Sequence, residues 1–187
     1  MGKNLREAAQ LNAGAHGLAA DGLAEEAVAD FSLDLLRDER MGIGMISFSQ
    51  SEEVVQQIMR EPYVNACTDG LLGGKPHPRA YGTYPRILGR YVRELGTLTL
   101  EDAVRKLSGL AAQTFGLSEY GRICEGARAN LVVFDTDRVL DLATFEDSKQ
   151  YPTGIEYVIV EGTVTVGPSG MADLPGSGVA VKSSTAH

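Results

Sequence analysis

The sequence has few of the residues that cross-link small proteins or bind metal ions in them. It contains two cysteines, Cys67 and Cys124, three histidines, His16, His77 and His187, and no tryptophan. Two cysteines 57 positions apart make neither a disulfide framework nor a zinc motif, and no two histidines have the spacing of metal ligands. We therefore predict no metal ligand within this sequence.

Clusters of basic residues and long apolar runs are also missing. The formal net charge is −8, and nucleic-acid phosphates or an anionic membrane would repel such a surface. No run of about 20 apolar residues could span a bilayer, and the first 25 residues lack the apolar core of a signal peptide. The composition predicts a cytoplasmic protein that binds neither nucleic acid nor membranes.

Apolar periodicity predicts an α/β architecture for the first two thirds of the chain. Apolar runs of strand length at 43–48 and 63–68 flank a helix that a Ser49–Glu52 capping box begins and Pro62 ends. This order indicates a strand–helix–strand unit with parallel strands. The other helices are expected at 3–10, 23–40, 84–95 and, after a Thr99 cap, 100–115, with a loop at 12–22.

The period becomes strand-like after residue 121. We expect a buried strand at 129–134 and a hairpin formed by 157–160 and 163–166. The two residues between them, Glu161 and Gly162, fit a tight turn. The chain from 167 onward is rich in Gly, Ser and Pro, a composition typical of disorder.

One candidate site stands at the end of the second expected strand. Asp69 follows that strand and opens a Gly-rich loop, and Arg79 comes ten residues later. A carboxylate can act as a general base, and a guanidinium binds a substrate carboxylate through two parallel hydrogen bonds. The plainer alternatives are that Asp69 caps an Asp-Gly turn and Arg79 is a surface arginine. His77, between two prolines, is interpreted as a structural loop residue.

Five segments in order resemble one family of enzymes. Residues 41–48 (MGIGMISF), 67–71 (CTDGL), 76–79 (PHPR), 81–86 (YGTYPR) and 126–135 (GARANLVVFD) are similar to the C-terminal part of N-acyl-D-amino-acid deacylases, the D-aminoacylase type of the amidohydrolase superfamily. The similarity extends from about residue 2 to about residue 166.

The resemblance implies the C-terminal part of a (β/α)8 barrel, with about its last two strands and helices, followed by strands of a small β-sandwich domain. Residues 1–118 would form the incomplete barrel, 119–167 the β-sandwich segment, and 168–187 a disordered tail.

The resemblance also implies a zinc-dependent hydrolase that splits the amide of N-acyl-D-amino acids. Asp69 matches the general base, and Arg79 and Gly70 match substrate-binding residues, with Arg79 on the α-carboxylate. The zinc ligands of the family lie upstream of this sequence. Cys67 is interpreted as a small core residue rather than a ligand. Asn130 stands where the family usually has Asp, which is expected to alter a turn contact and not the chemistry.

Three readings of the activity remain open. The chain is part of a deacylase that needs the missing metal-binding part, a non-catalytic remnant or partner-dependent half, or a relative acting on cyclic amides, as dihydroorotases and hydantoinases do. Besides the small-molecule substrate, the candidate partners are an N-terminal barrel fragment and a second copy of the chain, because two strands leave sheet edges and apolar helix faces open.

Overall fold

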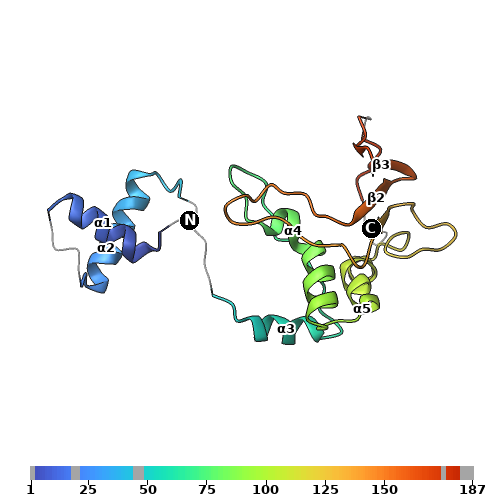
Figure 1. Ribbon diagram of the computed structural model, residues 1–187, viewed down its shortest axis with the longest axis horizontal. Coiled ribbons are helices and arrows are strands. Elements are labelled where there is room, and N and C mark those ends of the chain that lie inside the picture. Colours follow the sequence, from blue (N-terminus) through green and yellow to red (C-terminus); the bar gives the residue numbers. More distant parts are fainter. Residues whose placement is uncertain (1–2, 18–21, 44–48, 174–175, 182–187) are drawn as a thin grey trace. The chain divides into compact units, whose positions relative to one another are not determined.

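A computed structural model describes residues 3–17, 22–43, 49–173 and 176–181. Residues 1–49 and 50–187 form two separate compact units. The first unit holds two helices, α1 (Leu5–Ala15) and α2 (Glu25–Asp38), drawn in blue in Figure 1. They pack through Ala9, Ala13 and Val28, which are buried.

Helix α1 extends five residues beyond the expected end at residue 10, so the loop predicted at 12–22 was wrong for its first part. A reciprocal capping box begins the helix: the Asn4 side chain accepts from the Glu7 amide, and the Glu7 carboxylate accepts from the Asn4 amide. Four alanines follow in the helix, and alanine has the highest helix propensity. Burial of Ala13 against α2 favours the last turn.

The two expected parallel strands do not appear in the described part of the chain. Residues 44–48 of the first lie outside it. The second, 63–68, begins in a turn, has no assigned secondary structure at 64–68 and belongs to no sheet. The Lys106 ammonium donates to the Glu61 and Val64 carbonyls, and the Ala66 amide donates to the Lys106 carbonyl. Backbone groups that a neighbouring strand would bond are thus satisfied by one buried lysine instead.

The second unit begins with helix α3 (Glu52–Arg60), whose cap is Ser51 and not the expected Ser49. The Ser51 hydroxyl accepts from the Val54 amide at 3.3 Å. After the loop that follows α3 comes α4 (Arg79–Arg86), which continues as the π-helical η1 (Ile87–Glu94). This helix begins five residues before the expected start at 84. Pro85 lies inside it and brings no amide donor, and the wider i→i+5 turns begin two residues later.

Thr99 caps the next helix as expected, by accepting from the Asp102 amide at 3.1 Å. Three joined helical segments follow: α5 (Leu100–Val104), η2 (Arg105–Gly109) and α6 (Leu110–Thr114). Gly116 ends them with a φ of +66°, a value that favours glycine.

The core of the second unit lies between these helices and a loop that follows the first strand. Its buried members are Ile87, Leu88, Tyr91, Leu98, Ala103 and Val139. Val139 comes from that loop and is only 1% exposed. A Cβ added to Gly89 would lie 2.6 Å from the Val139 carbonyl oxygen, so glycine permits this close approach. Helices and loop therefore share one core across residue 118; the division predicted there stays a prediction.

A four-stranded antiparallel sheet completes the unit, with strands β1 (Leu131–Phe134), β2 (Ile155–Val160), β3 (Thr163–Gly167) and β4 (Gly170–Met171) in that order. The β2–β3 hairpin confirms the expected pairing, and both turn residues have the positive φ of a tight hairpin turn, +49° at Glu161 and +80° at Gly162. Strand β4 lies in the tail expected to be disordered.

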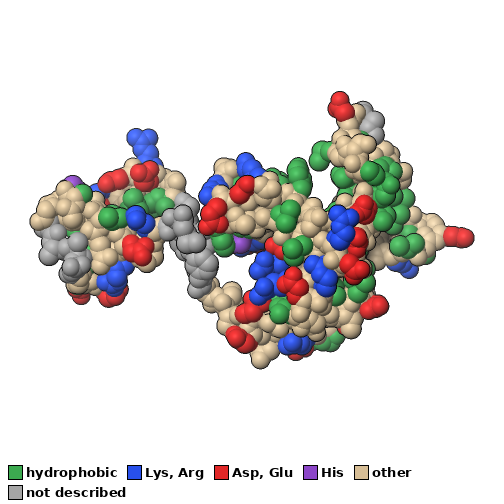
Figure 2. Space-filling view, viewed as in Figure 1, with side chains coloured by type: hydrophobic (Ala, Val, Ile, Leu, Met, Phe, Trp, Pro, Cys, Tyr) green, Lys and Arg blue, Asp and Glu red, His purple; other side chains and the backbone are tan. Residues whose placement is uncertain are grey.

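The expectation that β1 is buried was wrong. Val132 is 54% exposed and Val133 47% exposed, because the described residues form one sheet here, with no second sheet stacked on it. Figure 2 shows hydrophobic side chains gathered over β2 and β3. The α/β class holds, with a small antiparallel sheet; the incomplete barrel and the β-sandwich stay predictions.

Candidate active site

The two residues expected to carry the chemistry lie side by side. Arg79 is the first residue of α4, and its Nη2 lies 2.7 Å from Oδ2 of Asp69. Its Nε also donates to the main-chain carbonyl of Asp69 at 2.8 Å. Asp69 has a φ of +43°, which is unusual for a residue with a side chain. The turn at Asp69 thus offers Arg79 two acceptors from one residue.

Gly70 makes this turn possible by letting the chain pass close to α4. A Cβ at this position would lie 2.8 Å from the Ala80 Cα, a distance that real Cβ atoms do not show. The Gly70 amide donates to the Thr68 hydroxyl at 3.2 Å. Gly70 therefore holds Asp69 against the start of α4 and contributes no side chain of its own.

His77 fixes the first residue of α4. Its Nδ1 accepts from the Arg79 amide at 3.1 Å, which satisfies one of the free donors at the helix start. Its ring meets Phe145 edge to face, with centroids 5.0 Å apart. Desolvation, and then the nearby Arg79 charge, lower the pKa of His77, while the Asp69 charge opposes them. These contacts agree with a structural role for His77.

The geometry limits how Arg79 could bind a ligand. Because Nε is already bonded to the Asp69 carbonyl, a carboxylate would approach the end of the guanidinium, where Nη1 and Nη2 lie. Nη2 now bonds to the Asp69 carboxylate, so an incoming carboxylate would compete with Asp69. The Asp69 side chain is 74% exposed and the Arg79 side chain 42%, so both can be reached from solvent.

A family model described as "Amidohydrolase family" matches residues 9–166 of the chain. The chain belongs to the amidohydrolase family.

Three proteins of Alcaligenes xylosoxydans xylosoxydans are similar to this amidohydrolase over 120 residues, 64% of its length. They are an N-acyl-D-glutamate deacylase, 42% identical, an N-acyl-D-aspartate deacylase, 40% identical, and a D-aminoacylase, 45% identical. The matched part covers 24–25% of those proteins, so the chain spans about a quarter of their length.

Solved structures of D-aminoacylase and of an N-acyl-D-glutamate deacylase are also similar to this chain. A crystal structure of D-aminoacylase superposes with a TM-score of 0.70 at 34% identity, over 88% of this chain and 32% of that one. N-acyl-D-glutamate deacylase from Bordetella bronchiseptica, solved with zinc and a phosphonate inhibitor, superposes with a TM-score of 0.62 at 39% identity, over 66% of this chain and 27% of that one.

The zinc in the Bordetella bronchiseptica deacylase has no matching set of ligands in the part of this amidohydrolase that the structure describes. No three His, Cys, Asp or Glu side chains come close enough there to hold a metal ion. Asp69 is instead paired with Arg79. Cys67 and Cys124 are free and exposed, so the interpretation of Cys67 as a core residue was wrong. The described residues therefore do not fit a zinc centre.

A polar cluster that the sequence did not predict contacts α4 and η1. Arg86 bonds to Asp141 at 3.1 Å, and the Asp141 side chain is only 10% exposed. Burial lowers the pKa of Arg86, but the bond and the charge of Asp141 outweigh it, so that pKa is raised. Desolvation raises the pKa of Tyr91, and the Glu52 carboxylate adds to the effect. Arg86 and Asp141 stand 55 positions apart, and no motif joins them.

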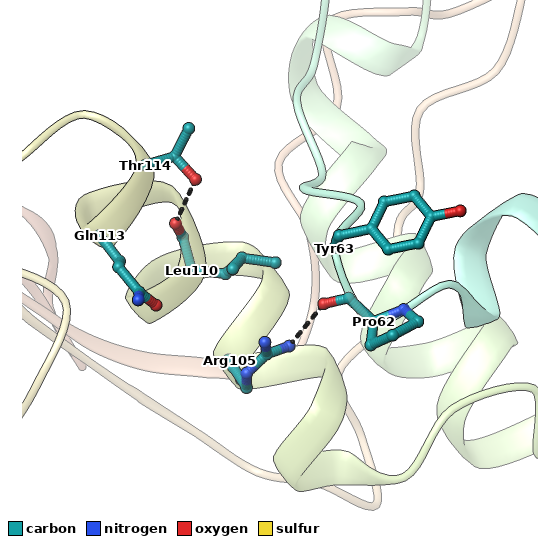
Figure 3. Close-up of a pocket in the computed structure, with 6 residues that line it drawn as sticks. All are labelled: Pro62, Tyr63, Arg105, Leu110, Gln113 and Thr114. Atoms are coloured by element: carbon teal, nitrogen blue, oxygen red, sulfur yellow. Dashed lines mark hydrogen bonds between the residues drawn. The ribbon is translucent and has the colours of Figure 1, made fainter.

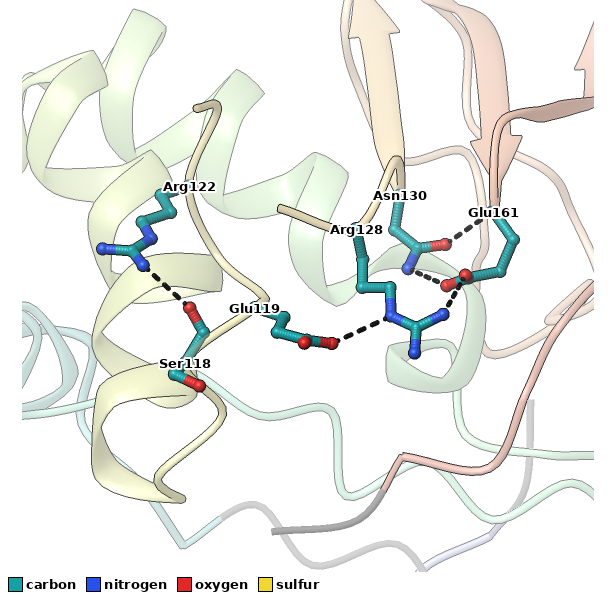
Figure 4. A network of polar contacts seen from close by, with 6 residues as sticks. All are labelled: Ser118, Glu119, Arg122, Arg128, Asn130 and Glu161. Atoms are coloured by element: carbon teal, nitrogen blue, oxygen red, sulfur yellow. Dashed lines mark hydrogen bonds and ion pairs between the residues drawn. The ribbon is translucent and has the colours of Figure 1, made fainter. Parts of the chain in front are cut away.

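A second polar network ties the sheet to the segment before it (Figure 4). Arg128 bonds to Glu119 at 3.1 Å and to Glu161 at 2.8 Å. Asn130 donates to the Glu161 carboxylate at 2.7 Å and accepts from the Glu161 amide at 2.9 Å. Asn130 thus contacts the hairpin turn. The hydrogen bond from Asn130 lowers the pKa of the Glu161 carboxyl most, and the bond from Arg128 lowers it further.

One groove in the described part of the chain has a volume of about 590 Å³ (Figure 3). It is lined by Pro62, Tyr63, Arg105, Leu110, Gln113 and Thr114. Arg105 donates to the Pro62 carbonyl at 3.0 Å, and the Thr114 hydroxyl donates to the Leu110 carbonyl. Arg105 and Thr114 thus bond to the protein itself, and the groove shares no residue with the Asp69–Arg79 pair.

Within the described residues no helix is both long and apolar enough to cross a membrane.

Proposed function

We propose that this chain supplies the general base and the carboxylate clamp of a hydrolase acting on N-acyl-D-amino acids. The observation that carries the proposal is the contact between Asp69 and Arg79, which lie within the segment matched by the family. The similar deacylases, named for N-acyl-D-glutamate and N-acyl-D-aspartate, support a substrate with a carboxylate next to a linear amide. They favour this substrate over a cyclic amide.

Each residue has one task in the proposed reaction. Arg79 binds the substrate α-carboxylate through its Nη atoms, and this displaces the Asp69 carboxylate. Asp69 then accepts a proton from the attacking water, whose oxygen bonds to the acyl carbon. The proton passes to the leaving nitrogen as the C–N bond breaks, giving a carboxylic acid and a D-amino acid. Gly70 keeps the two side chains within reach by allowing the close passage beside Ala80.

The chain spans about a quarter of the relatives, so we propose that the rest of the site, including the zinc ligands, lies outside this sequence. In the second candidate function the chain is a non-catalytic half that binds another polypeptide, either an N-terminal barrel part or a second copy. The exposed apolar residues of the sheet support it; they are Val132, Val133, Tyr157, Val164 and Met171.

Hydrolysis of N-acetyl-D-glutamate by the zinc-supplied chain tests the first proposal, with the L-enantiomer as control. The assay is run on the chain alone and after co-purification with the remaining part of the Alcaligenes N-acyl-D-glutamate deacylase. We expect turnover from the pair, and Asp69→Asn lowers kcat by roughly 10²–10⁴-fold. Arg79→Met raises KM, since it removes both donors to the α-carboxylate.

Two matched variants serve as controls. Asp137→Asn and Arg37→Met change an exposed acid and an exposed arginine outside the Asp69–Arg79 pair, and both keep wild-type turnover. Undiminished kcat in Asp69→Asn refutes the base assignment. An inactive pair that nevertheless co-elutes at a fixed ratio supports the binding function instead.

A further inference from the structure

The side chain of Arg79 is positioned from both ends of the residue. At the backbone, His77 Nδ1 accepts the Arg79 amide proton at 3.1 Å. At the tip, Nε donates to the Asp69 carbonyl at 2.8 Å. The second bond depends on where the backbone of Arg79 lies. Arg79 is the first residue of α4, so its amide has no carbonyl acceptor in an earlier turn of the helix.

The His77 ring is itself held in place. Phe145, from the loop after β1, meets it edge to face, with centroids 5.0 Å apart and planes at 83°. Pro76 and Pro78 flank it in the chain and fix their own φ angles. These contacts restrict the orientation of the His77 ring, with Nδ1 toward the Arg79 amide.

We propose that His77 is a positioning residue, whose neutral ring holds Arg79 at the start of α4 in the orientation that binds a carboxylate. This inference rests on the proposed function, in which Arg79 is the clamp. His77 touches no substrate atom and acts through Arg79.

The contact requires one protonation state. Nδ1 faces an N–H donor, so the proton of the neutral ring sits on Nε2. A protonated ring would turn Nδ1 into a donor and place a second positive charge beside Arg79. The charged groups acting on the ring are Arg79 and Asp69, while the loop packed on its other side presents Phe145.

Desolvation and Arg79 keep the pKa of His77 below its ordinary value of 6.5. The contribution is therefore complete above about pH 6.5 and is lost as the pH falls through the lowered pKa.

Two variants separate the hydrogen bond from the mere presence of a ring. His77→Asn keeps an acceptor that can reach the amide two residues on, and it does not titrate in this range. His77→Ala removes the acceptor. In ¹H–¹⁵N spectra of the full chain, we expect the Arg79 amide to titrate together with the His77 ring. In His77→Asn it does not titrate, and in His77→Ala it is shifted upfield at every pH.

Binding of N-acetyl-D-glutamate, followed at the Arg79 Nε–H, gives the functional readout. His77→Ala weakens the affinity roughly three- to tenfold, the size expected from losing one helix-start hydrogen bond. His77→Asn binds N-acetyl-D-glutamate with wild-type affinity, and this affinity no longer falls at low pH. A purely structural role would weaken binding in both variants and leave the pH profile unchanged.

The outcomes of the two readouts are distinguishable. An Arg79 amide that ignores the titration of His77 overturns the inference, whatever the ligand does. Coupling without any ligand effect at Arg79 supports the positioning role and refutes the clamp in the proposed function. His77→Asn keeps the acceptor for the Arg79 amide, so it unfolds at a higher denaturant concentration than His77→Ala does. A midpoint for His77→Asn below that of His77→Ala counts against the inference.

Discussion

Val139→Ala tests whether the helices and the sheet of residues 50–187 fold as one unit. Val139 lies in the loop after β1 and packs into the helical core with Ile87, Leu88, Tyr91, Leu98 and Ala103. The side chain is 1% exposed, so nearly all its apolar surface is removed from water.

The expected loss of stability follows from the atoms removed. Two buried methyl groups contribute about 1.6 kcal/mol at about 0.8 kcal/mol each, and the cavity left behind raises the cost to about 2–3 kcal/mol. The neighbours cannot close this cavity easily, because Gly89 already lies against the Val139 carbonyl and Gly154 against its amide nitrogen. For a chain of this size the melting temperature falls by roughly 5–10 °C.

Urea unfolding gives the free energy, and hydrogen exchange shows where it is lost. We expect faster exchange in α4, η1 and α5 as well as in β1 and β2, because one core joins them. Val164→Ala, the same change at a residue 46% exposed on β3, costs less than about 1 kcal/mol. If exchange accelerates only within 131–167 in Val139→Ala, the helices and the sheet are separate folding units and the reasoning is refuted.

Two further predictions concern the turns around the site and the sheet. Gly70→Ala brings a Cβ within 2.8 Å of the Ala80 Cα, so the chain must shift and N-acetyl-D-glutamate binding weakens. Titration calorimetry measures the affinity, and thermal unfolding checks that the variant is as stable as the wild type. Asn130→Asp sets a carboxylate against that of Glu161 and removes the donor at 2.7 Å, so the hairpin loses stability and the pKa of Glu161, measured by carbon NMR, rises. Because the folded pKa of Glu161 is lowered, its contribution exists above pH of about 4.5 and fades as the pH falls through the lowered pKa. In Asn130→Asp this acid-dependent loss starts at higher pH, and an unchanged profile would contradict the assigned contact.

Local signals in the sequence predicted much of the secondary structure. Periodicity predicted the helices at 52–60, 79–94 and 100–114, with bounds up to five residues from those observed. The Thr99 cap and the Glu161–Gly162 turn were predicted because each depends on a few adjacent residues whose preferences are steric or involve one nearby bond. The five motifs identified the family for the same reason, since they are read from the residues alone.

The strand expected at 63–68 failed because a strand needs a partner, and no local pattern supplies one. Lys106, more than 40 positions away, took the place of that partner. The sequence also placed Asp69 and Arg79 ten residues apart without showing that they bond to each other.

Residue identity along the chain thus determined the amidohydrolase membership, the helices and the candidate side chains. Tertiary structure decided which of those side chains meet. It brought Phe145 to His77, Asp141 to Arg86 and Val139 to the helical core. The physical reason is that each contact joins segments tens of residues apart, and their approach depends on the packing of the whole unit rather than on any local preference.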